Sequence, residues 1–110
     1  MKGEIYYGKG INQLKDNNPD LYELVNALNE TLWNGKTLDY KTQKLIAIGI
    51  TASRSDAKAT KNQIQSAIQE LDITKEEIVD VLRIVLLTSG MPAFSNSLQI
   101  LNSVVETIDK

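Results

Sequence analysis

The chemistry open to this chain is limited by two missing residue types. Its 110 residues include no cysteine and no histidine. Thiol redox chemistry, imidazole acid–base catalysis and a zinc site of the usual ligands are therefore excluded. Glu76, Glu77 and Asp80 include an i, i+4 carboxylate pair that could hold a hard cation. Carboxylates in a first helical turn more often serve as caps or dipole partners, so no metal and no cofactor is predicted.

Composition and charge indicate a single soluble domain. The chain is 42% hydrophobic and is long enough for one core but too short for two. Its formal charge of −2 supplies no field that would attract nucleic acid or anionic lipid. No apolar run approaches the roughly 20 residues that cross a bilayer. Without a signal-like start or a disulfide framework, we expect a cytoplasmic protein with neither a nucleic acid nor a membrane as partner.

The elements that must position any site are predicted to be helices. Apolar residues recur at spacings of three and four, and no strand-like alternation persists. Residues 1–17 hold three glycines and are predicted to be an N-terminal arm with at most one helical turn. Residues 18–110 are predicted to form an all-α domain of about five main helices. The expected starts are Asn18 with Pro19 at the first helical position, Asp39, about Asp56, Thr74 with Glu77 in a capping box, and Pro92 after a stop at Gly90.

Two of these helices carry more apolar surface than one small domain can cover. The helix after Thr74 is apolar almost all round, and its polar face is reduced to Asp80 and Arg83. The helix after Gly90 carries a seam of apolar residues at spacings of 4, 3, 4 and 3: Phe94, Leu98, Leu101, Val105 and Ile108. We expect these two helices to form the centre of the domain and much of an interface in a homo-oligomer.

The first long helix carries a stripe of leucines and one valine, and it has an aromatic residue near each end. The stripe consists of Leu21, Leu24, Val25, Leu28 and Leu32. Tyr22 and Trp33 lie near its start and end, and we expect both to be partly buried core residues rather than platforms for a ligand.

Three segments along the chain form a recognisable series. The first joins Asn-Pro-Asp-Leu at residues 18–21 to Leu-Asp-Tyr-Lys-Thr-Gln-Lys-Leu-Ile-Ala at 38–47. The second, at 67–78, begins Ala-Ile and ends Thr-Lys-Glu-Glu-Ile, and the third is Ser-Gly-Met-Pro-Ala-Phe at 89–94. In this order and separation, they resemble the carboxymuconolactone decarboxylase and alkylhydroperoxidase-D-like (AhpD-like) proteins. The resemblance implies an AhpD-like helical fold and assembly into homo-trimers or homo-hexamers.

The same resemblance implies where the active site would lie. Thiol-peroxidase members carry Cys-x-x-Cys-x-x-x-His just before the second segment, and counting back assigns the two cysteine positions to Asp56 and Ala59 and the histidine position to Gln63. A relay acid falls on Lys44 and a relay histidine on Lys58. Alanine offers no nucleophile, and a carboxamide exchanges no proton near neutral pH. Peroxidase activity is therefore predicted to be absent, and the decarboxylase branch, which is thought to use histidine, is also in doubt.

The substituted positions admit more than one interpretation. Lys44 and Asp56 could pair across the old pocket, or Asp56 could simply N-cap a helix while Lys44 is solvated. Lys44 could also be a catalytic amine, with the cationic Lys41 one turn away, or an ordinary surface lysine. Lys58 is most simply part of a solvated edge.

The functional prediction is a family member that binds a small polar ligand or serves in assembly without redox chemistry. No catalytic residue is assigned, and the ligand is expected at the degenerate family site formed by Lys44, Asp56, Lys58, Ala59 and Gln63. The alternative is an enzyme of the decarboxylase branch that acts on a carboxylate-bearing, lactone-like compound through its lysine, aspartate and glutamine groups.

Overall fold

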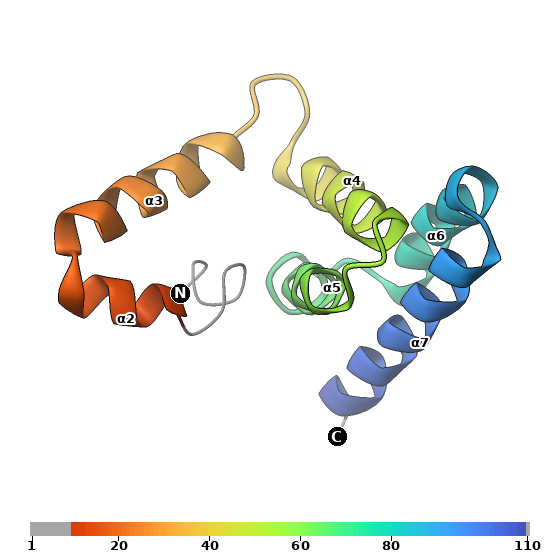
Figure 1. Cartoon of the computed structure of the whole chain (residues 1–110). Coiled ribbons are helices and arrows are strands. Elements are labelled where there is room, and N and C mark those ends of the chain that lie inside the picture. Colours follow the sequence, from red (N-terminus) through yellow and green to blue (C-terminus); the bar gives the residue numbers. More distant parts are fainter. Residues whose placement is uncertain (1–9, 110) are drawn as a thin grey trace. The chain divides into compact units, whose positions relative to one another are not determined.

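All the regular structure in the described part of the chain is helical, so the all-α prediction is confirmed. A computed structural model describes the backbone of residues 10–109 and the side chains of residues 13–109. The helices in these residues are α2 (Gly10–Asn17), α3 (Pro19–Leu32), α4 (Tyr40–Ser53), α5 (Ala57–Leu71), α6 (Lys75–Ser89) and α7 (Met91–Ile108) (Figure 1). None of them combines the length and apolar content needed to cross a bilayer.

The chain divides into two compact units, residues 1–43 and residues 44–110. In the first unit, α2 packs against α3. The ammonium of Lys15 lies 5.9 Å from the ring centre of Tyr22, which is buried as expected. The predicted arm is corrected here, because residues 10–17 form an eight-residue helix; residues 1–9 lie outside the described part. The division at residue 17 into arm and domain stays a prediction.

Helix α3 exposes most of its leucine stripe. Leu21, Leu24, Leu28 and Leu32 are all exposed, while Tyr22 and Asn29 form the buried side of the helix. The cap prediction at Asn18 is also partly wrong, because its side chain makes no capping hydrogen bond. Its backbone instead serves two helices: the Asn18 N–H donates to Leu14 of α2, and its carbonyl accepts from Tyr22 of α3.

A tightly packed loop joins α3 to α4. The Gln43 Nε2 donates to the Leu32 carbonyl oxygen over 3.0 Å, which ties the end of α3 to the start of α4. A Cβ added to Gly35 would lie 2.6 Å from the Leu38 carbonyl oxygen and 2.7 Å from that same Nε2. Only glycine leaves room for this approach.

Helix α4 begins at the predicted cap. Asp39 Oδ1 accepts the Thr42 backbone N–H over 2.9 Å, which satisfies one of the donors that a helix start leaves free. The hydrogen bonds from the side chain and the backbone of Thr42 lower the pKa of Asp39 below its ordinary value, and the nearby Lys41 acts in the same direction.

The second unit contains a continuous apolar core. Its centre is α7, which packs against both α6 and α5, and the tight turn at Gly90 that joins α6 to α7 is visible in Figure 1. The buried apolar side chains are Ile48, Ala52, Ile64, Ala67, Ile73, Ile78, Leu82, Val85, Ala93, Leu101 and Val104. The predicted central position of the last two helices is therefore confirmed.

The predicted boundaries of α5 and α6 are also confirmed. Asp56 caps α5, and Thr74 and Glu77 form a full capping box at α6. The chain breaks between α4 and α5 rather than bending, and Ser55 takes a left-handed backbone conformation there, with φ of 58°.

The lowered pKa of Asp39 predicts a pH dependence for stability. The folded pKa lies below the unfolded one, so the cap contributes stability above the ordinary value of 3.8 and loses it as the pH falls through the folded pKa. An Asp39→Asn variant keeps a cap without a titrating group. Urea titrations should show a constant stability difference between wild type and variant above about pH 5, and wild type should lose more stability than the variant toward about pH 3. Parallel pH profiles would contradict the assignment.

Candidate functional site

The most unusual side chain among the predicted site residues is Lys44. It lies in the second turn of α4 and is 0% exposed. Its Nζ donates to Gln63 Oε1 of α5 over 2.9 Å. A buried ammonium is stable only when polar groups surround it, so the Lys44 side chain is held inside the fold by its polar contacts. The interpretation of Lys44 as a solvated surface lysine is wrong.

The Gln63 carboxamide has a second polar group, the Nε2 donor. It is half-buried, and its carbonyl oxygen is used by Lys44. Its Nε2 donates to no group in residues 13–109. The carboxamide can therefore hold Lys44 on one side and still donate a hydrogen bond to an acceptor oxygen on the other.

Asp56 has a different role from the one that the pairing hypothesis gave it. Its Oδ1 accepts the Ala59 N–H over 3.1 Å at the start of α5, and the residue is exposed. Within residues 13–109 it makes no ion pair with Lys44. The cap satisfies a free N–H of the helix start, whereas an ion pair would require the carboxylate to be buried beside Lys44. The simple capping interpretation is confirmed.

The remaining predicted residues make no shared site. Lys58 is exposed on the first turn of α5, as expected of a solvated edge, and Ala59 is half-buried behind the cap. Of the five predicted residues, the structure therefore joins Lys44 to Gln63 by their side chains and Asp56 to Ala59 through the cap. The carboxylates near α6 also have ordinary roles: Glu77 caps the helix, and Asp80 lies 3.7 Å from Arg83 at the surface.

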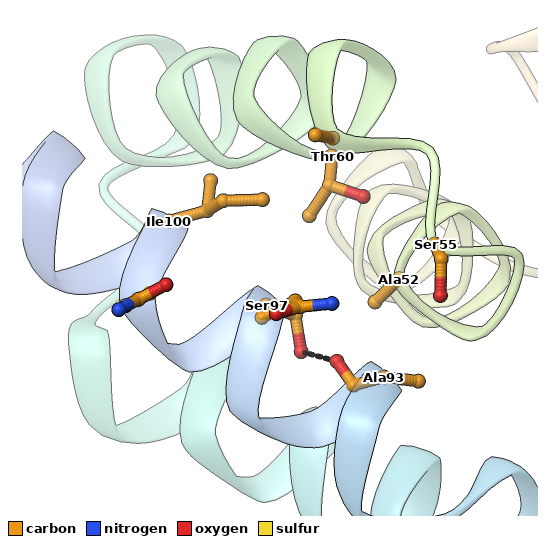
Figure 2. A pocket seen from close by; sticks show the side chains of 9 residues that line it. Ala52, Ser55, Thr60, Ala93, Ser97 and Ile100 are labelled. Carbon is orange, nitrogen blue, oxygen red and sulfur yellow. Dashed lines mark hydrogen bonds between the residues drawn. The ribbon is translucent and has the colours of Figure 1, made fainter.

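A pocket that the sequence analysis missed lies elsewhere on α5. It has a volume of about 200 Å³ (Figure 2). The lining residues are Ala52, Ser55, Ala57, Thr60, Ala93, Asn96, Ser97, Gln99 and Ile100. None of the five predicted residues is among them. The lining residues are small or uncharged, so the sequence offered no charged or nucleophilic signal for them.

The Lys44–Gln63 hydrogen bond predicts energetic coupling between the two side chains. Gln63→Leu should lower the free energy of unfolding by about 1.5–3 kcal/mol, because a buried ammonium loses a neutral acceptor. In a double-mutant cycle with Lys44→Met, the coupling energy should reach about 1 kcal/mol or more. The exposed Asp80–Arg83 pair is the control and should give about 0.5 kcal/mol or less. Additive effects of Gln63→Leu and Lys44→Met in urea denaturation would contradict the coupling.

Comparison with known proteins agrees with this helical architecture. The family model for the carboxymuconolactone decarboxylase family matches residues 19–103. The chain is 59% identical over 104 residues to the uncharacterized protein MJ0742 of Methanocaldococcus jannaschii, covering 94% of this chain and all of that protein. It is 36% identical over 96 residues to the uncharacterized protein MJ1511 of the same organism, covering 87% of this chain and 89% of that protein. The family match spans α3 to α7, and the chain therefore belongs to the carboxymuconolactone decarboxylase family.

Proposed function

We propose that this chain is a non-redox member of its family that binds a small polar ligand beside the Lys44–Gln63 pair. The observation that carries the proposal is the 2.9 Å hydrogen bond from the buried Lys44 ammonium to Gln63. The family resemblance assigns these two positions to the relay acid and the histidine of thiol-peroxidase members. In this chain they form a hydrogen-bonded pair, and the Gln63 carboxamide exchanges no proton near neutral pH.

The absence of cysteine supports the non-redox part of the proposal. A peroxidatic reaction needs a thiolate, and a second thiol then resolves the sulfenic acid. The 110 residues contain no cysteine. At the two positions that the resemblance assigns to cysteine, Asp56 caps a helix and Ala59 supplies the N–H for that cap.

The free donor of Gln63 indicates what kind of ligand would fit. Its Nε2 has no acceptor among residues 13–109, while its carbonyl oxygen is held by Lys44. An acceptor oxygen of a carboxylate, a carbonyl or a lactone matches this arrangement. We therefore assign a small oxygen-rich ligand to this site.

Gln63→Glu separates binding from folding. The glutamate keeps an oxygen facing Lys44 but removes the N–H donor and adds negative charge. In a thermal-shift screen of organic acids and lactones, a hit at ten times its Kd should raise the Tm of wild type by roughly 5–10 °C. That shift should disappear in Gln63→Glu and remain in Gln69→Glu, an exposed position on the same helix.

The result for Gln63→Glu also tests the location of the site. A hit that stabilises Gln63→Glu as much as wild type would place the ligand elsewhere. In a separate assay with hydroperoxide and a thiol reductant, the rate with protein should equal that of buffer. A rate above buffer would overturn the non-redox assignment.

One observation favours an enzyme as the second candidate. Lys44 is fully buried, and burial is the environment that a catalytic amine requires. The substrate would be a carboxylate-bearing, lactone-like compound. Incubating a thermal-shift hit with protein and following it by NMR distinguishes the two functions: a binder leaves the compound intact, whereas an enzyme converts it and loses that activity in Lys44→Met.

Assembly into a homo-trimer or homo-hexamer is part of the same proposal. Ile84, Leu87 and Met91 stay exposed around the end of α6, and Leu87 is 79% exposed. Apolar side chains gathered in this way are typical of a surface that is covered in an assembly. Cytoplasmic localisation stays a prediction from the sequence.

The assembly is tested by placing a charge on this surface. Leu87→Asp should shift the mass measured by light scattering from an oligomer toward a single chain, because burying an unpaired carboxylate is costly. Asn102→Asp introduces the same charge at an exposed position of α7 and should leave the mass unchanged. An unaltered oligomer in Leu87→Asp would exclude this surface as the interface.

A further inference from the structure

The pocket of about 200 Å³ lies against α4, α5 and α7 (Figure 2), and neither Lys44 nor Gln63 lines it. Ala52 and Ala93 are buried at its floor, and their small side chains leave the space open. Ile100 supplies an apolar wall. The left-handed turn at Ser55 brings the end of α4 to the rim. Since one water occupies about 30 Å³ of liquid, the pocket holds roughly six or seven groups of that size.

Thr60 is the unusual polar side chain of this pocket. It is only 1% exposed, and Figure 2 shows its side chain pointing from α5 into the space that α7 and Ala52 enclose. Its hydroxyl makes no hydrogen bond to any group in residues 13–109. In the described residues, the buried side-chain atoms without a partner consist of Gln43 Oε1 alone, so the Thr60 oxygen remains accessible from the pocket that it lines. A group inside the pocket can therefore form a hydrogen bond with it.

Ser97 lies across the pocket on α7 and is also 1% exposed. Its hydroxyl donates to the Ala93 carbonyl oxygen over 2.7 Å and lies 3.0 Å from that of Phe94. With its proton engaged, the Ser97 oxygen can only accept from a ligand. Thr60 can both donate and accept, so the two hydroxyls together suit a ligand with a donor and an acceptor.

The charges around the pocket select against ions. None of its nine lining residues is charged. The start of α5, whose N–H groups would attract an anion, already carries the Asp56 carboxylate as its cap. A charged ligand would lose its hydration without gaining an opposite charge.

We infer that this pocket is a second ligand site, which binds a small uncharged compound bearing a hydroxyl or carboxamide group. The polar group of the ligand contacts Thr60 and Ser97, and its alkyl part contacts Ala52, Ala93 and Ile100. This inference does not depend on the proposal that a ligand binds beside Lys44 and Gln63.

Propionamide, 1,2-propanediol and propionate are matched probes of similar size. Titrated into the full chain labelled with ¹³C at alanine methyl groups, propionamide or propanediol should give saturable shifts at Ala52 and Ala93. Propionate has nearly the same shape as propionamide but carries a charge, and it should bind at least about tenfold more weakly. Absence of saturable shifts with both neutral probes would show that water alone fills the pocket, and would overturn the inference, as would equal affinity for propionate.

Variants at Thr60 test the role of the hydroxyl. Thr60→Val keeps the shape and removes the donor, so it should weaken binding of the neutral probes by about tenfold. Thr60→Ser keeps the hydroxyl and should bind within about threefold of wild type. Thr107→Val, at an exposed threonine of α7, is the control and should not change the affinity. Undiminished binding in Thr60→Val, with its fold verified by the unchanged alanine spectrum, would contradict the site.

Discussion

The packing of α6 against α7 organises residues 44–110. Gly90 ends one helix and begins the next, and its φ of 91° is a conformation that other residues rarely adopt. With so short a connection, the apolar faces of the two helices meet directly, and Leu82 and Leu101 are fully buried. The other helices complete this core: α4 contributes Ile48 and α5 contributes Ile64. Both candidate sites depend on this arrangement, because each uses residues of α5, which packs against α7.

The two sites on α5 differ in chemistry. At one, a buried ammonium of α4 is held by the carboxamide of Gln63, in a pair that is charged and fixed. At the other, the buried hydroxyls of Thr60 and Ser97 face an uncharged space. Thr60 and Gln63 are three residues apart and lie on the same side of α5, but Gln63 is not among the residues that line the pocket. The chain has no cysteine for thiol chemistry, but α5 carries polar side chains in both environments.

Much of the helical layout could be predicted because its signals are local. Caps act over three residues, and those at Asp39, Asp56 and Thr74 form as the sequence predicts. The stop at Gly90 is equally local. The prediction failed at residues 10–17, where packing of α2 against α3 supports a helix that glycine content argued against. Contact with another helix outweighs a weak local propensity.

The candidate site shows the same division between local and tertiary information. The family resemblance selected Lys44 and Gln63, but only the fold showed that they touch and that Lys44 is buried, because the contact spans 19 residues and two helices. The pocket at Thr60 could not be predicted, since alanines, serines and threonines carry no distinctive pattern. The sequence by itself determined which residues start and stop helices, and that no thiol or imidazole is available. The tertiary structure decided which polar groups are buried together, because burial depends on contacts between segments that are distant along the chain.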